Sequence, residues 1–472
     1  MQSEITKFQA IDLRNVSDTP QWQLLDSESK LTIQVVGEVL PFRTNQYVMD
    51  SLIDWTNVPN DPIFQLVFPQ REMLDATDFQ SIQRLIKDGD QKALASEVNL
   101  IRRSLNPHPA GQLTHNVPRL EGRELPGLQH KYRETVLFFP ASGQTCHAYC
   151  TYCFRWAQFV GLADLKFQAR ETGDLVRYLK ANRDVTDVLI TGGDPMIMST
   201  NVLRRYIEPL LDPELENVQN IRIGTKAIAY WPQRFVTDSD ADECLKLFEK
   251  IVASGRHLAI MGHCSHPVEF DSAISREAIS RIRSTGAQVR MQAPLIRRVN
   301  DDPTVWANLW RRGVQLGLIP YYMFVERDTG AQNYFEVPLV RAYEIFKQAY
   351  ASVSGLARSV RGPSMSAFPG KVRILGVITL RDMMDPQVLE ILRENIRFDL
   401  LGEPDQPLLV CDFIQARNPE WVRKPFFAEF DDGASWFDEL RPAFGKEKFY
   451  FEEPDVEDNS RPLLELTEML LD

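Results

Sequence analysis

The chain has 472 residues, of which 25% are charged and 44% hydrophobic, with six cysteines and a formal net charge of −12. The hydrophobic fraction excludes a wholly disordered or collagen-like chain, and the absence of any run of eighteen apolar residues excludes a membrane-spanning helix. The acidic balance argues against a nucleic-acid partner, because phosphate binding needs a basic face. The first residues lack the pattern of a signal peptide, so we expect a cytoplasmic protein.

Three parts are expected along the chain. Residues 1–126 are predicted to form a largely helical extension, in which 78–105 carry apolar residues at helical spacing with Gly89 as a break between two helices. Residues 127–361 alternate short apolar runs with amphipathic stretches. Residues 362–472 form the third part, in which this rhythm fades and a short apolar run, 372–380, follows Lys371. The last sixty residues are rich in proline, phenylalanine and acids, so we expect an irregular C-terminal lobe or arm there.

Six apolar runs in the central part are predicted to be buried strands: 135–141, 187–193, 220–227, 257–264, 288–295 and 319–325. The amphipathic stretches between them have the spacing of helices. This alternation predicts an α/β fold with a parallel sheet, either partly closed as a barrel or open and doubly wound. In both cases the functional residues should lie at the C-terminal ends of the strands.

Polar residues follow the predicted strands where that rule expects them. A cysteine cluster follows the first strand, residues 191–195 (TGGDP) the second, and His263 the fourth. The fifth strand carries Gln292, and residues 326–328 (ERD) follow the sixth. Five strands therefore direct polar chemistry toward one edge of the sheet.

Cys146, Cys150 and Cys153 crowd into eight residues. Three thiolates at this spacing can hold three irons of a [4Fe–4S] cluster and leave the fourth iron open, as a catalytic cluster requires. Two alternatives stay open. Zinc usually takes four nitrogen or sulfur ligands, and His147, between the first two cysteines, would be an odd fourth. The three residues could also be simple buried cysteines, since six in this length are too sparse for a disulfide scaffold.

The cysteine pattern, with the aromatic Tyr152 before the last cysteine, resembles the signature of radical S-adenosylmethionine (SAM) enzymes. The resemblance narrows to the lysine 2,3-aminomutase family and covers about residues 55 to 375. It rests on these segments, in family order: NDPIFQLVFP, PGLQHKY, CHAYCTYCFRW, ITGGDP, IRIGTKA, HCSHPVE, MQAPLIRRVND, PYYMF and PGK. It implies a partial (β/α)6 TIM-like barrel of the radical SAM type. The implied reaction moves the amino group of a free α-amino acid from C2 to C3.

The resemblance also implies three cofactors, which are a [4Fe–4S] cluster, SAM and pyridoxal phosphate (PLP). The family's GGD segment, which meets the SAM amino group, corresponds here to Gly192, Gly193 and Asp194. Glycines allow close backbone approach, and a carboxylate suits an ammonium. His263 and Gln292 resemble further residues of the SAM pocket, beside Tyr152. The alternative for each is an ordinary structural role.

Two further residues resemble parts of the family's machinery. Lys371, in PGK, matches the lysine that binds PLP as a Schiff base; taken alone it would be read as a surface residue. The family has a run of glycines before this lysine, and this chain has one, in SAFPG. The difference concerns the geometry of the loop that binds the PLP phosphate and not the lysine itself. Arg155, in CFRW, matches the arginine that grips the substrate carboxylate, for which a bidentate guanidinium is suited. A surface or phosphate-contacting arginine is the alternative.

The resemblance is weakest at the substrate side chain. Lysine enzymes of the family hold the distal ammonium with two aspartates, and the matching positions here are Arg327 and Ser364. A cation at the first position disfavours a second cation, because like charges in a closed pocket repel. Arg327 therefore favours an acidic or polar side chain, and lysine stays open, since Glu326 or Asp328 could substitute by a shift in register.

Rival functions are a radical SAM enzyme of another class without PLP, performing epimerisation, elimination or peptide modification, and a non-catalytic iron–sulfur protein. The family resemblance implies an electron donor such as flavodoxin or ferredoxin, and a homo-oligomer. The C-terminal cysteine cluster that binds zinc in many lysine aminomutases is reduced here to Cys411, so no such site is expected. Cys244 and Cys264 are expected to serve packing.

Overall fold

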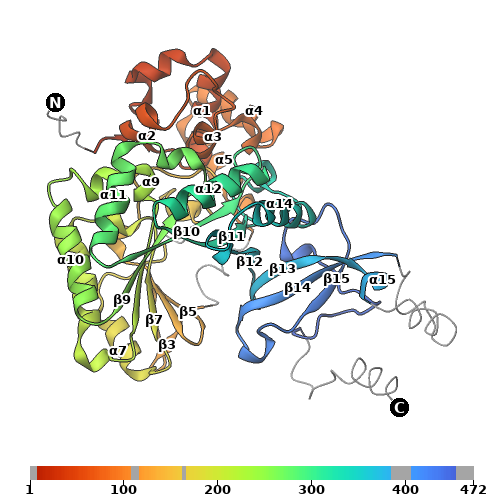
Figure 1. Cartoon of the computed structure of the whole chain (residues 1–472). Coiled ribbons are helices and arrows are strands. Elements are labelled where there is room, and N and C mark those ends of the chain that lie inside the picture. Colours follow the sequence, from red (N-terminus) through yellow and green to blue (C-terminus); the bar gives the residue numbers. More distant parts are fainter. Residues whose placement is uncertain (1–7, 108–115, 162–165, 384–404, 453–472) are drawn as a thin grey trace. The chain divides into compact units, whose positions relative to one another are not determined.

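The computed structural model describes residues 8–107, 116–161, 166–383 and 405–452 (Figure 1). The chain divides into two compact units, residues 1–365 and 366–472, which are described separately. The expected three-part organisation stays a prediction, because the first unit holds both the N-terminal helices and the large sheet.

The N-terminal part of the first unit is largely helical. Its elements are β1 (Ala10–Ile11), α1 (Ser27–Val39), β2 (Thr44–Asn45), α2 (Gln46–Ser51), α3 (Pro62–Val67), α4 (Ala76–Asp88) and α5 (Gln91–Ser104). The predicted break between two helices is confirmed. Gly89 ends α4 in the left-handed conformation with φ +70°, and the Asp90 side chain then accepts from the Ala93 N–H to begin α5.

A mixed sheet occupies the centre of the first unit. Its strands are β5 (Leu128–Tyr132), β6 (Thr135–Phe138), β7 (Asp187–Ile190), β8 (Asn220–Thr225), β9 (His257–His263), β10 (Gln288–Leu295), β11 (Ile319–Val325) and β12 (Arg361–Ser366). Neighbouring strands pair in parallel from β6 through β12, with β12 as the last of the series. β5 pairs antiparallel with β6. The six predicted strands are confirmed as β6 to β11. The sequence reasoning did not predict β5 or β12. A short hairpin, β3 (Arg119–Leu120) and β4 (Arg123–Glu124), precedes the sheet.

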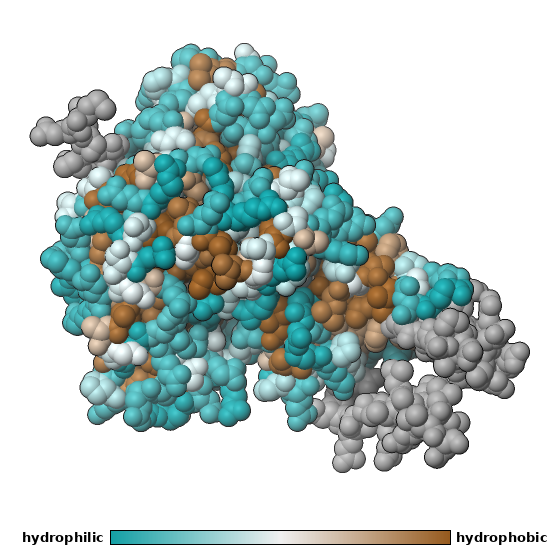
Figure 2. Space-filling view, viewed as in Figure 1, coloured by the Kyte–Doolittle hydropathy of each residue, from teal (hydrophilic) through white to brown (hydrophobic). Residues whose placement is uncertain are grey.

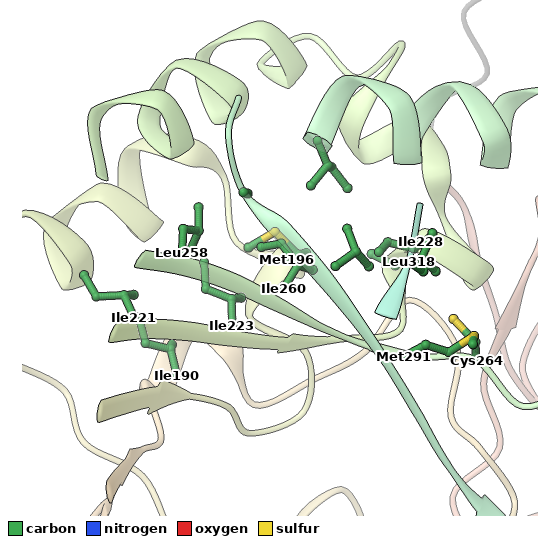
Figure 3. Close-up of a cluster of buried hydrophobic side chains, with 14 of the residues drawn as sticks. Ile190, Met196, Ile221, Ile223, Ile228, Leu258, Ile260, Cys264, Met291 and Leu318 are labelled. Atoms are coloured by element: carbon green, nitrogen blue, oxygen red, sulfur yellow. The ribbon is translucent and has the colours of Figure 1, made fainter. Parts of the chain in front are cut away.

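Helices follow the parallel strands as predicted. They are α7 (Gly173–Ala181), α8 (Thr200–Ile207), α9 (Ala227–Tyr230), α10 (Ala241–Ala253), α11 (Ala273–Ser284), α12 (Pro303–Gln315), α13 (Gln332–Phe335) and α14 (Leu339–Ala351). Apart from α13, whose Tyr334 and Phe335 belong to a second core, their apolar faces form one core with the sheet. Ile190, Ile221 and Ile260 are fully buried in it (Figure 3). Each such side chain contributes about 1.5–3 kcal/mol relative to exposure.

Strand alternation assigns the opposite face of the sheet to the functional residues. Ile260 of β9 and Met291 of β10 belong to the core beneath the helices. Since successive side chains of a strand point to opposite faces, His263 and Gln292 lie on the other face. Both residues lie toward the C-terminal ends of their strands, where the sequence predicted the functional residues.

The N-terminal helices pack over that edge. A second apolar core joins residues of α1 to α5 with the loops that follow the strands, including Trp156, Trp231 and Phe335, each at most 2% exposed. The extension is therefore part of the structure that surrounds the strand ends.

The second unit contains an antiparallel sheet. Its elements are β13 (Gly370–Thr379), α15 (Leu380–Met383), β14 (Pro407–Ala416) and β15 (Phe426–Glu429), and β14 pairs with both other strands. Sequence reasoning noted the apolar run at 372–380, which forms most of β13, but did not predict this sheet. The irregular lobe expected over the last sixty residues stays a prediction. Inward residues of β13 alternate with outward ones, which builds one apolar face. Phe413 and Phe426 pack with Phe451 beneath it.

The surface of the first unit is largely hydrophilic in the view of Figure 2, with apolar residues in separate groups. Among the described residues, no helix combines the length and apolar character required to cross a bilayer.

Gly127 provides a test of the packing before β5. Its φ is +83°, and a Cβ there would overlap the Ala169 backbone nitrogen; Gly122 has a similar φ of +78° with nothing within 4 Å. We expect Gly122→Ala to destabilise by about 1 kcal/mol from backbone strain alone. Gly127→Ala should cost about 2 kcal/mol more through overpacking. Urea unfolding midpoints of both variants measure this, and equal midpoints would contradict it.

Candidate active site

The loop after β6 carries the three clustered cysteines. The Cys153 N–H donates to the Cys150 carbonyl at 3.0 Å, and the Trp156 N–H to the Cys153 carbonyl at 2.9 Å, which folds the loop into consecutive turns. Burial raises the pKa of all three thiols, that of Cys153 to about 12. Burial is the main cause for Cys146, and the two neighbouring thiols add smaller contributions in the same direction.

The N-terminal extension holds this loop in place. The Tyr149 N–H donates to the Arg43 carbonyl at 2.8 Å, and the Thr151 N–H to the Leu66 carbonyl at 2.9 Å. Asn45 adds a side-chain hydrogen bond from Nδ2 to the His147 carbonyl at 3.2 Å. Sequence reasoning missed this role of the extension. The available signal was the segment NDPIFQLVFP, which contains Leu66.

The donor set of the loop suits a cluster with several irons. Within the described ranges, no three Cys, His, Asp or Glu side chains are grouped closely enough to hold one metal ion. A cubane does not require this, because each thiolate ligates its own iron. Three neighbouring soft thiols therefore fit the cluster, and a single zinc would need further rearrangement.

The GGD segment after β7 packs directly on the cysteine loop. The Gly193 N–H donates to the Gly143 carbonyl at 3.0 Å, and the Asp194 N–H to the Thr145 carbonyl at 2.7 Å. A Cβ on Gly193 would lie 2.5 Å from the Thr145 oxygen, and one on Gly192 would overlap the Gln144 amide. The two glycines are therefore needed for the close approach of the two loops.

The Asp194 carboxylate is buried and accepts several hydrogen bonds. Its donors are the N–H groups of Met196 (2.9 Å) and Lys226 (2.8 Å) and the hydroxyl of Thr225 (2.7 Å). Burial nevertheless raises its pKa to about 6. These contacts engage both oxygens and tie the GGD turn to the end of β8. The expected contact of Asp194 with the SAM ammonium stays a prediction.

His263 and Gln292 are brought together at the ends of β9 and β10. The His263 Nε2 and Gln292 Nε2 atoms are 3.2 Å apart. Burial lowers the pKa of His263 to about 4, so the imidazole is neutral at pH 7 and can accept from the amide. The structure thus pairs two residues expected in the SAM pocket.

A buried ion pair, which sequence reasoning missed, lies beside the cysteine loop. Lys226 Nζ is 2.7 Å from Glu269 Oε1 and 4.4 Å from the centre of the Tyr230 ring. The Tyr230 hydroxyl is 4.0 Å from Cys150 Sγ, and the Lys226 charge opposes the burial that raises the pKa of that thiol. Tyr152 joins the group through its hydroxyl, 3.4 Å from Ser265 Oγ. The sequence signal for this pair was available in two motifs, since IRIGTKA contains Lys226 and HCSHPVE contains Glu269.

Arg155 is partly buried and follows Cys153 by two residues. Its guanidinium lies over the Phe139 ring at 4.3 Å and donates to Gln144 Oε1 at 3.3 Å, while its Nε has no hydrogen-bond partner. Burial lowers its pKa to about 10, so it stays cationic at pH 7. The side chain therefore retains a donor for an anion.

Three more polar residues lie at the end of β11 and on β12. Glu326 is buried, and neither carboxylate oxygen has a hydrogen-bond partner. Ser364, in register with Phe324, is fully buried with an unpartnered hydroxyl. Arg327 is partly exposed, 3.5 Å from Asp328, and its guanidinium lies 5.6 Å from the Phe154 ring centre.

The remaining predicted positions lie elsewhere. Lys371 is on β13 in the second unit, where it pairs with Gln415. Cys244, Cys264 and Cys411 are buried and form no disulfides, and Cys244 lies on α10 as predicted.

Comparisons with known proteins give consistent names. No family model matches the chain. It is 30% identical over 367 residues to a putative L-lysine 2,3-aminomutase of Aquifex aeolicus, covering 78% of this chain and 84% of that one. Identity to the L-lysine 2,3-aminomutase of Methanococcus maripaludis is 25%, covering 70% of this chain and 66% of that one. Identity to the glutamate 2,3-aminomutase of Clostridioides difficile is 26%, covering 45% of this chain and 47% of that one. Among solved structures, a radical SAM methyltransferase from Sphaerobacter thermophilus aligns at a TM-score of 0.35 and 16% identity, over 61% of this chain and 94% of that one.

The cysteine loop predicts a specific pattern of iron loss. We expect Cys146→Ala, Cys150→Ala and Cys153→Ala each to lose most of the iron and sulfide bound after anaerobic reconstitution, because a thiolate ligand is removed. Cys244→Ala and Cys411→Ala, which alter buried packing cysteines, are matched controls and should retain it. Metal and sulfide analysis measures the outcome. Bound zinc in place of iron, or full iron in the three loop variants, would contradict the prediction.

Proposed function

We infer the reaction of this chain on the premise that it belongs to the lysine 2,3-aminomutase family. It is a radical SAM aminomutase that moves the amino group of a free α-amino acid from C2 to C3, with a [4Fe–4S] cluster, SAM and PLP as cofactors. One observation carries the proposal: the cysteine loop after β6 packs on the GGD turn after β7 through the Gly193 and Asp194 N–H groups. When bound, the cluster and SAM supply one-electron chemistry at the substrate, and PLP holds the migrating amino group.

Cys146, Cys150 and Cys153 would hold the cluster. The N-terminal extension fixes their loop before any iron arrives, since Arg43 and Leu66 accept backbone hydrogen bonds from it. Preorganised ligands lose less conformational freedom on binding. The buried Lys226–Glu269 pair supports the same loop from the β8 and β9 side.

The other residues of the edge are assigned to SAM and substrate. We place SAM against Gly192 and Gly193, with His263, Gln292, Tyr152 and Asp194 completing its pocket. Arg155 would bind the substrate carboxylate, because its buried Nε is unpartnered and has a donor to offer. Arg327 and Ser364 are assigned to the side-chain end of the pocket, and Lys371 to PLP.

Several finer features complete the proposal. We propose that the parallel strands β6 to β11 curve as the partial (β/α)6 barrel of radical SAM enzymes. Radical chemistry also needs a one-electron donor, and flavodoxin or ferredoxin in the cytoplasm fits that need. A homo-oligomer is proposed on the family resemblance alone.

An anaerobic assay tests the reaction. The reconstituted protein with SAM, PLP and reductant is offered lysine, glutamate, glutamine, arginine and alanine. We expect product NMR to show the amino group of one of them on C3, and Cys150→Ala to abolish the product. If SAM is cleaved but no amino group moves, the chain is a radical SAM enzyme of another class. If SAM is not cleaved, the enzymatic proposal fails.

Lys371 makes a separate prediction about PLP. We expect borohydride to fix PLP covalently on Lys371 in wild-type protein, because a Schiff base is reduced to a stable amine. Lys371→Ala should lose the label, and Lys424→Ala, on an exposed lysine of the same unit, should keep it. Peptide mass spectrometry locates the label. PLP bound equally by Lys371→Ala would refute this assignment.

A further inference from the structure

The side chain of Tyr230 ends at a cysteine of the loop after β6. Tyr230 is the last residue of α9 and is 1% exposed. Its hydroxyl lies 4.0 Å from Cys150 Sγ, at the outer limit of a hydrogen bond to sulfur. The hydroxyl forms no other hydrogen bond with the described residues. A buried tyrosine hydroxyl normally has a partner, and the sulfur is the partner that this fold provides.

The backbone of Tyr230 is tied to the same loop. The Asn45 side chain donates from Nδ2 to the Tyr230 carbonyl at 3.0 Å and to the His147 carbonyl at 3.2 Å. The next residue, Trp231, stacks its ring on that of His147 with the centroids 6.4 Å apart. These contacts fix the end of α9 against the cysteine loop. The separation of the hydroxyl and the sulfur is therefore set by two joined backbone segments.

A cation covers one face of the Tyr230 ring. Lys226 Nζ lies 4.4 Å from the ring centre. It is held there by Glu269 Oε1 at 2.7 Å and by Ser265 Oγ at 3.2 Å. A cation over an aromatic ring is attracted to it, so Lys226 helps to fix the orientation of the ring. It also makes the phenol a stronger donor, because a nearby positive charge polarises the hydroxyl.

The sulfur of Cys150 changes its role when the cluster is bound. The thiolate that ligates iron accepts hydrogen bonds and has no proton to donate, so the Tyr230 hydroxyl would be the donor. Reduction adds one electron to the cluster and increases the negative charge on its sulfur ligands. A hydrogen bond to such a sulfur is therefore stronger in the reduced state. Hydrogen bonds to the sulfurs are among the factors that set the potential of an iron–sulfur cluster.

We propose that Tyr230 is a positioning residue of the cluster, whose hydroxyl donates to Cys150 Sγ and makes the cluster easier to reduce, with Lys226 fixing the ring. The inference rests on the proposed function, since it requires that Cys150 ligate the cluster. One electron passes from a low-potential donor protein, or from dithionite in the experiment, to the oxidised cluster. Tyr230 keeps its proton, and no covalent bond of the residue changes.

A potentiometric titration of the reconstituted holoenzyme tests this role. The protein is reduced in steps with dithionite, and the reduced cluster is measured by electron paramagnetic resonance. Tyr230→Phe removes only the hydroxyl and keeps the ring under Lys226. At a fixed potential its ratio of reduced to oxidised cluster should fall about 10-fold, which lowers the midpoint by about 59 mV for one electron. An unchanged or higher midpoint would overturn the proposal.

A matched variant controls for the loss of a buried phenol hydroxyl. Tyr178, on α7, is also buried, and its hydroxyl lies 2.6 Å from His130 Nδ1. Tyr178→Phe should keep the wild-type midpoint potential, because its hydroxyl bonds a histidine and not a cysteine. A shift as large as that of Tyr230→Phe would show a general effect of hydroxyl loss and would refute the assignment.

A stronger donor at the same position should act in the opposite direction. Tyr230→fluorotyrosine carries a more acidic phenol, so its hydrogen bond to the sulfur should strengthen and raise the midpoint potential. A lower midpoint in this variant would mean that ring packing, and not the hydroxyl, controls the potential.

Iron and sulfide analysis separates this role from support of the loop. Tyr230→Phe should bind as much of both as the wild type does, and a marked loss would assign Tyr230 to the fold. The two proposals also fail differently. If the wild type binds no iron, both fail. If the wild-type cluster forms and SAM is cleaved, while Tyr230→Phe keeps the wild-type potential, only the role of Tyr230 is wrong.

Discussion

Parallel strand pairing is the constraint on which the site depends. From β6 to β12 every neighbouring pair runs in the same direction, so the polar residues that follow the strands collect at one edge. The cysteine loop, the GGD turn and the His263–Gln292 pair come from separate stretches of sequence and meet only for this reason. Strand alternation then divides the residues, placing apolar side chains under the helices and His263 and Gln292 on the opposite face.

Burial of charge is the second consequence, and the N-terminal extension causes much of it. The extension packs over the strand ends and so removes water from the cysteine loop. This burial raises the thiol pKa values and strengthens the electrostatic interactions between nearby charges. The buried ionisable groups differ in the partners that the fold provides. Glu269 compensates Lys226, and Asp194 receives donors from three residues. Glu326 differs from both, because neither of its carboxylate oxygens has a hydrogen-bond partner among the described residues and burial raises its pKa.

The predictable part of the fold was the part with strong local signals. The strands β6 to β11 were found because strands buried on both faces read as continuous apolar runs, and the break at Gly89 because glycine accepts a positive φ. β12, with the sequence RGPSMS, was missed since its polar letters and Pro363 resemble a loop. Its burial comes from long-range pairing with β11, which no local pattern records. The strands of the second unit were not predicted for a related reason, because segments rich in proline and acids separate them.

The site divides along the same line. Motif residues such as the three cysteines, Gly193 and Arg155 were named from sequence, because their spacing is local. Lys226 and Glu269 stood in quoted motifs, yet their pairing needs β8 and β9 side by side. At the end of β11, matching by position selected Arg327, and only the structure shows that Glu326 beside it is buried while Arg327 is partly exposed. A charge acts in a pocket through its desolvation as well as its sign, and desolvation is a property of the fold.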